Sequence, residues 1–379
     1  MKRVAHILSY FPGQEGLTSF CRGLGSACEE IEEVDVPIIT FRGKPAKEFT
    51  GREPPLIKFP HRKRHPFDLP AGFLQALDSG ELVLDGAVLH GTYSPQVFAL
   101  ARALHKRAIP YIFMPHDPYV KDLRRHRAVR KFVYWHLCEK WVIDHAAAIQ
   151  LLSASHESSL RNLGRKTRVF TIANGCHPED RKFIDPKARV PGESDDFLIQ
   201  YLGRMDRNHK GLDLLIQGYA QFLKGLDSGE KIVLQFSGND WVDRPFLESL
   251  ASELGISERV RFTGRLSDHS VTIHSRADLS VLCSRFDGFG LTIVEAMLAG
   301  RPVLVSREAG IAEHVEKAGA GFLVDPNADS ISEGFVRAWK ARKEISAMGR
   351  RGQEFVCSDL TWSSVAAKSV EIYRAVFEG

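Results

Sequence analysis

The chain has 379 residues, which is enough for two domains of ordinary size. Its hydrophobic content of 44%, charged content of 26% and formal net charge of +4 fit a globular protein and give no reason to expect nucleic-acid binding. No window approaches the run of roughly 20 apolar residues that a membrane-spanning helix needs. The six cysteines form no CxxC pair, so we expect buried free thiols in a cytoplasmic protein, without a zinc site or a disulfide framework.

The first half of the sequence alternates predicted strands with predicted helices. Short apolar runs predict strands at 4–11, 36–41, 87–90, 110–114, 147–152 and 168–172. Amphipathic spacing predicts helices at 17–30 and 96–107. The segment 42–66 is rich in Pro, Lys and Arg and is expected to be irregular. Because strands and helices alternate, we expect a parallel sheet with helices on its faces.

Two residues of this half stand beside predicted strand ends. Gly16 closes the loop after the first strand, and His116 follows the strand at 110–114. Ligands of open α/β sheets bind at the carboxyl ends of the strands, so both positions suit a ligand. By residue type alone, a lone histidine is more often structural, and the loop before Gly16 could be an ordinary strand–helix connection.

The most basic part of the sequence lies in the first half. Residues 121–131, KDLRRHRAVRK, contain six Lys or Arg and precede a segment with Phe132, Trp135 and Trp141. Such a charge run is commonly a solvated face. Basic residues beside aromatic ones also suit contact with an anionic membrane surface or acceptor, and we keep both interpretations. Nucleic acid is the weaker candidate, because no aromatic-interleaved binding module accompanies the run.

The second half repeats the same alternation. The segment 178–196, rich in Pro, Gly and charge, predicts a linker. Predicted strands then lie at 197–202, 231–236, 259–263, 279–283, 303–305 and 321–324, and a closing helix lies at 362–377. We therefore expect an α/β protein with two doubly wound, Rossmann-like parallel sheets. The expected domains are 1–185, joined by 361–379, and 186–360.

A phosphate-binding arrangement is predicted after the strand at 197–202. Gly203 and Arg204 follow this strand, and Lys210 stands at the expected start of the next helix. Free N–H groups at a helix N-terminus and two fixed cations favour a diphosphate. The alternative is a pair of surface cations without a ligand.

The stretch 284–306, SRFDGFGLTIVEAMLAGRPVLVS, predicts a strand end, a Gly-rich turn, a helix and another strand. The helix begins at Leu291, directly after Gly290, so its first amides can bind an anion. Glu295 lies near the apolar face and could accept two hydrogen bonds from a ribose diol, or it could be a half-exposed residue beside an arginine. Asp287 could act on a ligand or cap the turn.

The same stretch resembles the acidic-x7-acidic signature of retaining glycosyltransferases of family 4, which have the GT-B fold. That family usually reads E-G-F-G-L-x-x-x-E-A-M-A-x-G-x-P-V; this chain has Asp287 in place of the first Glu and Leu298 in place of Ala. The segment 203–211 is similar to the family's G-R-L-x(n)-K-G motif, and the helix at 362–377 is similar to its closing helix. In GT-B proteins the two domains face a cleft, and the closing helix crosses back to the first domain.

The resemblance implies a role for each residue of these motifs. Arg204 and Lys210 would neutralise the departing nucleoside diphosphate, and Glu295 would hold the ribose. His116 and Asp287 would orient the transferred sugar. Further contacts to the nucleotide sugar, mostly through backbone groups, would come from Gly16, Gly203, Gly238, Gly264, Phe289, Gly290 and Leu291.

The implied activity is transfer of a sugar from a UDP-, GDP- or ADP-linked donor to a hydroxyl of a glycan or lipid-linked acceptor, with retention of configuration. The resemblance implies no cofactor and no obligatory metal, and the sequence contains no Asp-x-Asp motif. Peripheral contact with the inner face of the membrane through 121–131 is a further expectation. The alternatives are a sugar-nucleotide epimerase or glycan phosphorylase of the same two-domain plan, and a nucleotide-sugar binding protein without turnover.

Overall fold

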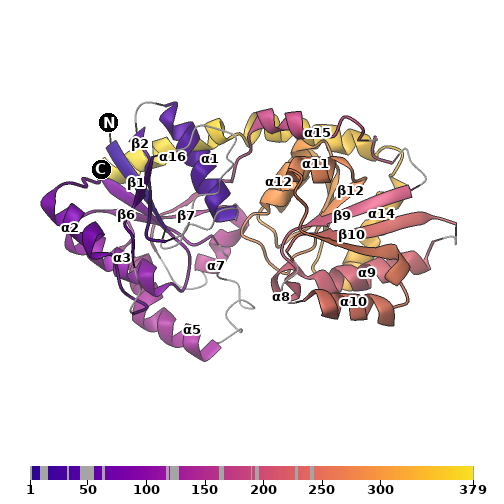
Figure 1. Cartoon of the computed structure of the whole chain (residues 1–379), viewed down its shortest axis with the longest axis horizontal. Coiled ribbons are helices and arrows are strands. Elements are labelled where there is room, and N and C mark those ends of the chain that lie inside the picture. The colour runs from indigo at the N-terminus through magenta and orange to yellow at the C-terminus, as the bar shows by residue number, and fades with distance from the viewer. Residues whose placement is uncertain are drawn as a thin grey trace. The chain divides into compact units, whose positions relative to one another are not determined.

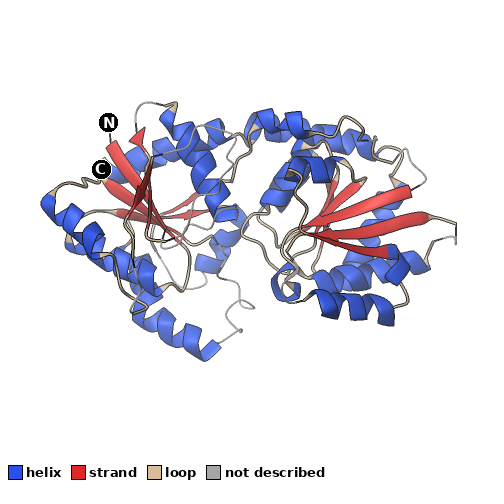
Figure 2. Cartoon of the chain, in the orientation of Figure 1, coloured by secondary structure: helices blue, strands red, loops and turns tan. Residues whose placement is uncertain are grey.

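The chain forms two structural units, each built around its own parallel sheet (Figures 1 and 2). The structure is a computed structural model, and it describes residues 2–8, 16–31, 34–42, 55–61, 65–116, 119, 128–161, 166–188, 190–192, 196–226, 229–239 and 243–378. The first unit comprises Met1–Gly175 and Trp362–Gly379, and the second comprises Cys176–Thr361. The α/β class with two parallel sheets, expected from the alternation of strands and helices, is confirmed.

The sheet of the first unit has the strand order β4-β3-β1-β5-β6-β7-β8, with β2 also paired to β1, and all of its pairs are parallel. Its strands are β1 Lys2–Leu8, β2 Val34–Asp35, β3 Ile38–Thr40, β4 Leu56–Lys58, β5 Gly86–His90, β6 Tyr111–Met114, β7 Ala148–Leu151 and β8 Val169–Thr171. Strands β5, β6 and β7 are buried along their whole length. Both faces of these strands are covered, which explains why they read as continuous apolar runs.

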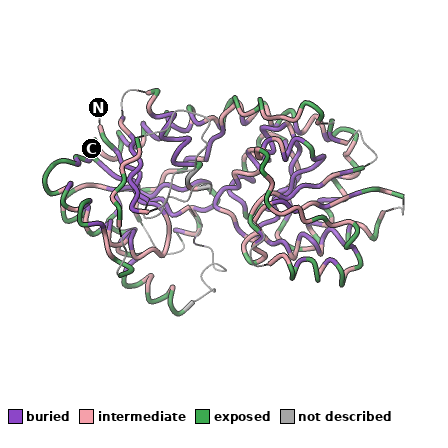
Figure 3. Tube along the Cα trace, in the orientation of Figure 1, coloured by how far each residue is buried: buried purple, intermediate pink, exposed green. Residues whose placement is uncertain are grey.

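Helices cover both faces of this sheet, and their outer sides are exposed (Figure 3). They are α1 Gly16–Glu29, α2 Ala71–Ser79, α3 Pro95–Lys106, α5 Ala128–Tyr134, the π-helix η1 Trp135–Glu139, α6 Lys140–His145, the 3₁₀ turn η2 Ala154–His156, α7 Glu157–Arg161 and α16 Trp362–Phe377. One expectation is wrong here, because the segment 42–66 contains β4. Its backbone pairs with β3 at the edge of the sheet, where the neighbouring prolines are tolerated.

The sheet of the second unit has the strand order β11-β10-β9-β12-β13-β14 and is also entirely parallel. Its strands are β9 Asp196–Leu202, β10 Lys231–Ser237, β11 Val260–Gly264, β12 Leu279–Leu282, β13 Val303–Ser306 and β14 Gly321–Val324. Its helices are η3 Pro178–Phe183, α8 Arg207–Lys210, α9 Leu212–Lys224, α10 Arg244–Glu253, η4 Ser257–Arg259, α11 Ser270–Ser275, α12 Leu291–Leu298, α13 Ala312–Ala318, α14 Ala328–Lys340 and α15 Ile345–Asp359.

The strand orders locate a switch point in each sheet. In the second unit the chain proceeds from β9 to β10 and β11 on one side, and from β12 to β13 and β14 on the other. In the first unit β1 has β3 on one side and β5 on the other. Open α/β sheets bind ligands at the carboxyl ends of the strands beside such a reversal. A ligand is therefore expected at the edge after β9 and β12 in the second unit, or at the edge after β1 and β5 in the first.

The first boundary between the units follows Gly175, earlier than the expected boundary at residue 185. The reason is η3, which packs against α11 and α12 of the second unit. The Thr272 hydroxyl donates to the carbonyl of Phe183 at 2.6 Å, and the Phe183 ring stacks on His269. Much of the expected linker at 178–196 thus belongs to the second unit. The second boundary, after Thr361, lies one residue from the expected position.

The closing helix α16 packs on α1 within the first unit. The Trp362 indole covers Gly23 so closely that a Cβ at Gly23 would lie 2.2 Å from indole Cε2. At the other end of the helix, a Cβ at Gly86 would lie 2.7 Å from the ring of Phe377. These glycines let two aromatic side chains fix both ends of α16 against the first unit.

We predict that Gly23→Ala lowers the free energy of unfolding by about 1 to 3 kcal/mol, because the added methyl group overlaps the Trp362 indole. In an unobstructed helix the same change would stabilise by up to about 1 kcal/mol. Gly72→Ala in α2 of the same unit is the matched control, since its nearest neighbour, Phe59 Cδ1, is 3.8 Å away. Chemical denaturation checks both variants, and equal stability of the two would contradict the packing argument.

Candidate functional site

Three glycines meet at the carboxyl edge of the second sheet. Gly203 follows β9, Gly238 follows β10, and Gly264 ends β11. The Gly203 N–H donates to the Ser237 carbonyl at 3.0 Å, and the Gly238 N–H donates to the Gly264 carbonyl at 2.9 Å. A Cβ at Gly238 would lie 2.0 Å from the Gly203 oxygen. Only glycine allows these strand ends to approach so closely, and the result is an edge of bare backbone open to a ligand.

Arg204 stands at this edge on an anchored backbone. The hydroxyl of the buried Tyr201 donates to the Arg204 carbonyl at 2.7 Å. The Arg204 side chain is exposed, and its guanidinium forms no hydrogen bond or ion pair with the described residues. It is therefore available to an anion.

Lys210 differs from its expected place at a helix start. It is the last residue of the one-turn helix α8, and Gly211 separates it from α9. Gly211 has φ +61°, and a Cβ there would lie 2.4 Å from the Cys283 carbonyl oxygen. This close approach brings α8 against the chain that follows β12.

Lys210 and Asp287 form an ion pair with each other. Lys210 Nζ lies 2.5 Å from Asp287 Oδ2, and the two side chains are only 20% and 11% exposed. The Asp287 backbone is held by Gly310, whose N–H donates to its carbonyl at 3.1 Å. From the sequence we expected Lys210 at the diphosphate and Asp287 at the transferred sugar, and we did not predict that the two residues pair with each other. In this arrangement the pair contributes little net charge to the edge.

The Gly-rich turn leads into the N-terminus of α12. Gly290 has φ +102°, and a Cβ there would lie 2.8 Å from Leu282 Cδ2. The Phe289 side chain is buried, so only its backbone could reach a ligand. Leu291 begins the helix, and the first amides of a helix have no intrahelical acceptor. The helix start expected after Gly290 is therefore present beside β12, and anion binding there stays a prediction.

Glu295 lies one turn into α12 and is half-buried. Burial raises its pKa to about 7, a hydrogen bond with Ser270 opposes the rise, and the nearby carboxylate of Asp180 adds to it. These neighbours replace the arginine considered in the sequence analysis. Asp180 has a buried oxygen without a hydrogen-bond partner among the described residues. Sequence reasoning missed Asp180, because its Pro-rich and charged surroundings suggested a linker.

The remaining expected residues belong to the first unit. His116 follows β6 with the unusual φ of +65°, and its Nε2 lies 2.8 Å from Nδ1 of His90. Helix α1 begins at Gly16, whereas the loop at 9–15 lies outside the described residues. Neither the role of Gly16 nor that of His116 is tested by this geometry.

The basic stretch is only partly described, since residues 120–127 are not among the described ones. Residues 128–131 lie in α5, and apolar side chains are exposed along α5 and η1: Val129 is 79%, Phe132 66% and Leu137 69% exposed. No helix within the described part of the chain is long and apolar enough to cross a bilayer.

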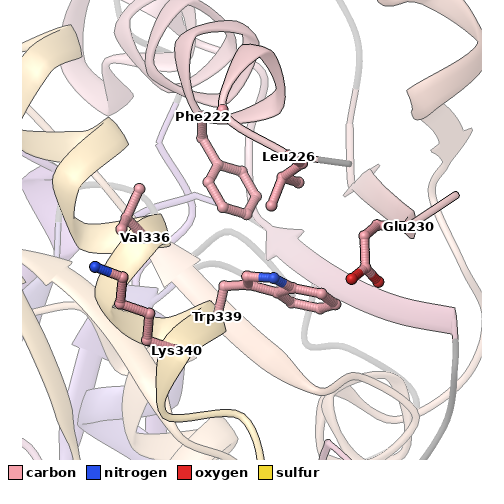
Figure 4. A pocket seen from close by; sticks show the side chains of 7 residues that line it. Phe222, Leu226, Glu230, Val336, Trp339 and Lys340 are labelled. Atoms are coloured by element: carbon pink, nitrogen blue, oxygen red, sulfur yellow. The ribbon is translucent and has the colours of Figure 1, made fainter. Parts of the chain in front are cut away.

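The second unit has another hollow, which is separate from the glycine edge (Figure 4). Its walls come from the end of α9, the segment before β10 and α14, and its lining residues are Phe222, Gly225, Leu226, Glu230, Val336, Trp339 and Lys340. Because Glu230 precedes β10, this hollow lies toward the amino end of that strand. It is thus remote from the glycine edge, and we assign it no role.

Comparison with known proteins identifies the family of the chain. Residues 16–175 match the glycosyl transferase 4-like domain, and residues 183–355 match glycosyl transferases group 1. The MMP alpha-(1->4)-mannosyltransferase of Mycolicibacterium hassiacum is 31% identical, over 91% of this chain and 92% of the relative. The chain belongs to the group 1 glycosyltransferase family. The resemblance to family 4 is confirmed by these matches.

Other relatives align over a shorter part of the chain. An uncharacterized glycosyltransferase of Methanocaldococcus jannaschii is 28% identical over 56% of this chain and 55% of the relative. D-inositol 3-phosphate glycosyltransferase 1 of Catenulispora acidiphila is 30% identical over 56% of this chain and 53% of the relative. The alignments thus span about half the length of these curated relatives.

Solved structures agree on the fold. Sucrose-phosphate synthase from Thermosynechococcus elongatus superposes with a TM-score of 0.77 at 20% identity, covering 100% of both chains. WaaG, a glycosyltransferase involved in lipopolysaccharide biosynthesis, superposes with a TM-score of 0.70 at 19% identity, covering 97% of this chain and 99% of WaaG. At these identities the likeness establishes the GT-B fold class and nothing finer.

We predict that the affinity for a nucleotide sugar rises about tenfold between pH 6 and 8, because Glu295, with a pKa of about 7, must ionise before both of its oxygens can accept hydrogen bonds from a diol. The diphosphate of an intact nucleotide sugar has no group that titrates in this range. Glu295→Gln should remove the pH dependence, whereas Glu258→Gln, on the exposed surface of the same unit, should retain it. Isothermal titration calorimetry provides the measurement, and a wild-type affinity that does not change with pH would exclude this role.

Proposed function

We propose that this protein is a retaining glycosyltransferase that moves a hexosyl group from a nucleoside diphosphate sugar to an acceptor hydroxyl in glycoconjugate biosynthesis. The observation that carries the proposal is the carboxyl edge of the second sheet, where the open glycine backbone, the start of α12 and the Arg204 guanidinium, which has no partner among the described residues, come together. The bond from the anomeric carbon to the diphosphate oxygen breaks, and a bond to the acceptor oxygen forms on the same face. The acceptor proton passes to the departing diphosphate.

In this proposal the diphosphate takes the developing negative charge, and the edge stabilises it. Arg204 and the first amides of α12, at Gly290 and Leu291, supply preorganised positive potential. Lys210 lies within reach of the same edge through its pair with Asp287 and adds its charge when a ligand competes for that pair. The fixed cations replace a metal ion, so the reaction needs neither metal nor organic cofactor.

The other proposed roles concern the sugar and the nucleoside. Glu295 accepts hydrogen bonds from the ribose, and Gly203, Gly238 and Gly264 offer backbone groups to the nucleotide. Asp287 and His116 orient the transferred sugar.

The relatives support a hexosyl donor but differ in the base that they use. One of them is a GDP-mannose-dependent mannosyltransferase of Mycobacterium tuberculosis, 26% identical over 44% of this chain. One similar structure, HepE of Anabaena, is in complex with UDP-glucose. UDP, GDP and ADP donors all remain in the proposal.

The turnover test begins with thermal unfolding in UDP-, GDP- and ADP-sugars, which identifies the donor that binds. Release of the nucleoside diphosphate with candidate acceptors is then measured in EDTA. We expect Arg204→Ala to lower kcat by about 10² to 10³, as for the loss of one preorganised donor to a developing anion. Arg350→Ala, an exposed arginine on α15, should leave kcat unchanged.

Two results would overturn the proposal. A donor that binds without turnover, whatever the acceptor, would identify a nucleotide-sugar binding protein. Isomerisation of the donor sugar without an acceptor would identify an epimerase. Loss of turnover in EDTA that is restored by a divalent cation would reject only the metal-independent mechanism.

We further propose that the first unit contacts an anionic membrane surface through 121–131 and the exposed face of α5 and η1. The exposed apolar residues Val129, Phe132, Val133 and Leu137 follow helical spacing, and Arg130 and Lys140 are exposed beside them. An apolar stripe flanked by basic residues suits the interface of an anionic bilayer. The M. tuberculosis relative named above is described as a phosphatidylinositol monomannoside mannosyltransferase, which supports a lipid-linked acceptor.

Liposome pelleting at low salt tests this contact. We expect binding to vesicles with anionic phospholipid and little binding to purely zwitterionic ones. Phe132→Ser combined with Leu137→Ser should weaken the binding about tenfold, because two apolar side chains no longer enter the interface. Val83→Ser, at another exposed apolar residue of the first unit, is the matched control. Equal binding to both vesicle types, or none to either, would reject the proposed contact.

A further inference from the structure

Three histidines and a tyrosine form a continuous hydrogen-bonded chain within the first unit. His116 Nε2 lies 2.8 Å from His90 Nδ1, and His90 Nε2 lies 2.9 Å from His6 Nδ1. His6 Nε2 in turn lies 2.8 Å from the hydroxyl of Tyr373. The chain runs from the end of β6, across the last residue of β5 and the middle of β1, to the closing helix α16. It therefore passes through the switch point of the first sheet.

The chain is enclosed by apolar and aromatic groups. His6, His90 and Tyr373 are buried, and the ring of Phe20 from α1 lies against all three imidazoles at centroid distances of 5.7 to 6.1 Å. Burial lowers the pKa of His6 to about 3 and of His116 to about 4, and it holds the pKa of His90 well below its ordinary value. The three rings are thus neutral at pH 7. The thiols of Cys21 and Cys28 are neutral as well, because burial raises their pKa.

Neutrality restricts the protons of the chain to two arrangements. Each neutral imidazole has one N–H, so in each contact one ring donates and the other accepts. Either every donor points toward His116, beginning with the Tyr373 hydroxyl, or every donor points toward Tyr373. A phenol is a better donor than a neutral imidazole, and an imidazole nitrogen is a better acceptor than a phenol oxygen. The Tyr373 hydroxyl also hydrogen-bonds with Ser369 on the same helix, and when Ser369 donates in that contact the phenol proton is left for His6. The first arrangement is therefore favoured.

We propose that Tyr373, His6 and His90 are positioning residues that hold His116 in one tautomer, with its Nδ1–H directed away from the chain as a donor to a sugar substrate. In this tautomer His116 Nε2 accepts from His90, and Nδ1 has no partner among the described residues. The backbone of His116 is in the left-handed region, with φ +65°, which costs a non-glycine residue conformational energy. This inference rests on the proposed function for one point, namely that the group accepting the Nδ1–H belongs to a sugar.

A bound metal ion is the competing explanation for the same cluster. His6, His90 and Cys21 place three potential ligand atoms within 4.8 Å of one another. However, the 2.9 Å between the two imidazole nitrogens is the length of an N–H···N hydrogen bond, which requires a proton rather than a metal between them. We therefore favour the protonated chain, and metal content is one outcome of the test.

The first experiment is nitrogen NMR on protein with ¹⁵N-labelled histidine, assigned with a His116→Ala variant. We expect His116 in the Nδ1–H tautomer in the wild type. In Tyr373→Phe, which removes the terminal donor, we expect a shift of at least one third of the population toward the Nε2–H tautomer. Tyr111→Phe is the control, because it loses a buried hydroxyl donating to the Val142 carbonyl but leaves the chain intact. An Nε2–H tautomer in the wild type, or stoichiometric zinc lost in Cys21→Ala, overturns the proposal.

The second experiment is a double-mutant cycle on turnover. Tyr373→Phe should lower kcat about tenfold with little change in KM, which is typical of losing a group that orients a functional histidine. In the His116→Ala background the same change should have no further effect, because Tyr373 acts through His116. Additive losses would mean that Tyr373 is only structural and would overturn the positioning role. If no variant turns over any substrate, the proposed function fails, and the NMR result alone decides the tautomer.

Discussion

The close approach of backbone to backbone at glycines is the constraint on which the second unit depends. Gly238 lies against the Gly203 carbonyl, and Gly211 lies against the Cys283 carbonyl, at distances that leave no room for a Cβ. These contacts bring the chain after β9, β10 and β12 to one edge of the sheet. A side chain at either glycine would separate the strand ends, and Arg204, Lys210 and the start of α12 would no longer share that edge.

The charges at this edge are largely compensated within the protein. Lys210 pairs with Asp287, and Arg285 forms a bidentate pair with Asp213 at 2.7 and 2.8 Å. Burial raises the pKa of Asp213, but the hydrogen bonds and charge of Arg285 outweigh it, so the pKa stays below its ordinary value. The two pairs tie the Gly-rich turn to α8 and α9. Among the described residues of this edge, the exposed Arg204 is then a cation left to meet an anionic ligand directly.

The sequence predicted the helices and strands that are determined by residues close together in the chain. Apolar runs located the buried strands, and Gly290 and Gly300 with Pro302 bounded α12 closely. What it missed depends on contacts between distant segments. Strand β4 exists because it pairs with β3, and Asp180 faces Glu295 because η3 packs on α11 and α12. Neither register nor packing is encoded in composition. The Lys210–Asp287 pair was missed because each residue was interpreted alone.

Buried titratable groups of this chain change its folding stability with pH in two opposite directions. The histidines have lowered pKa values, so the stability that they permit is present above about pH 6.5 and is lost as the pH falls toward 4. Glu139 in η1 has a pKa raised to about 7 by burial, despite accepting hydrogen bonds from Tyr119 and the Tyr93 N–H, so its contribution is lost as the pH rises. Among the described residues of the first unit, three histidines with lowered pKa values thus oppose one glutamate with a raised pKa. Acid should therefore loosen the first unit through the histidine chain, the same feature that connects the closing helix to His116.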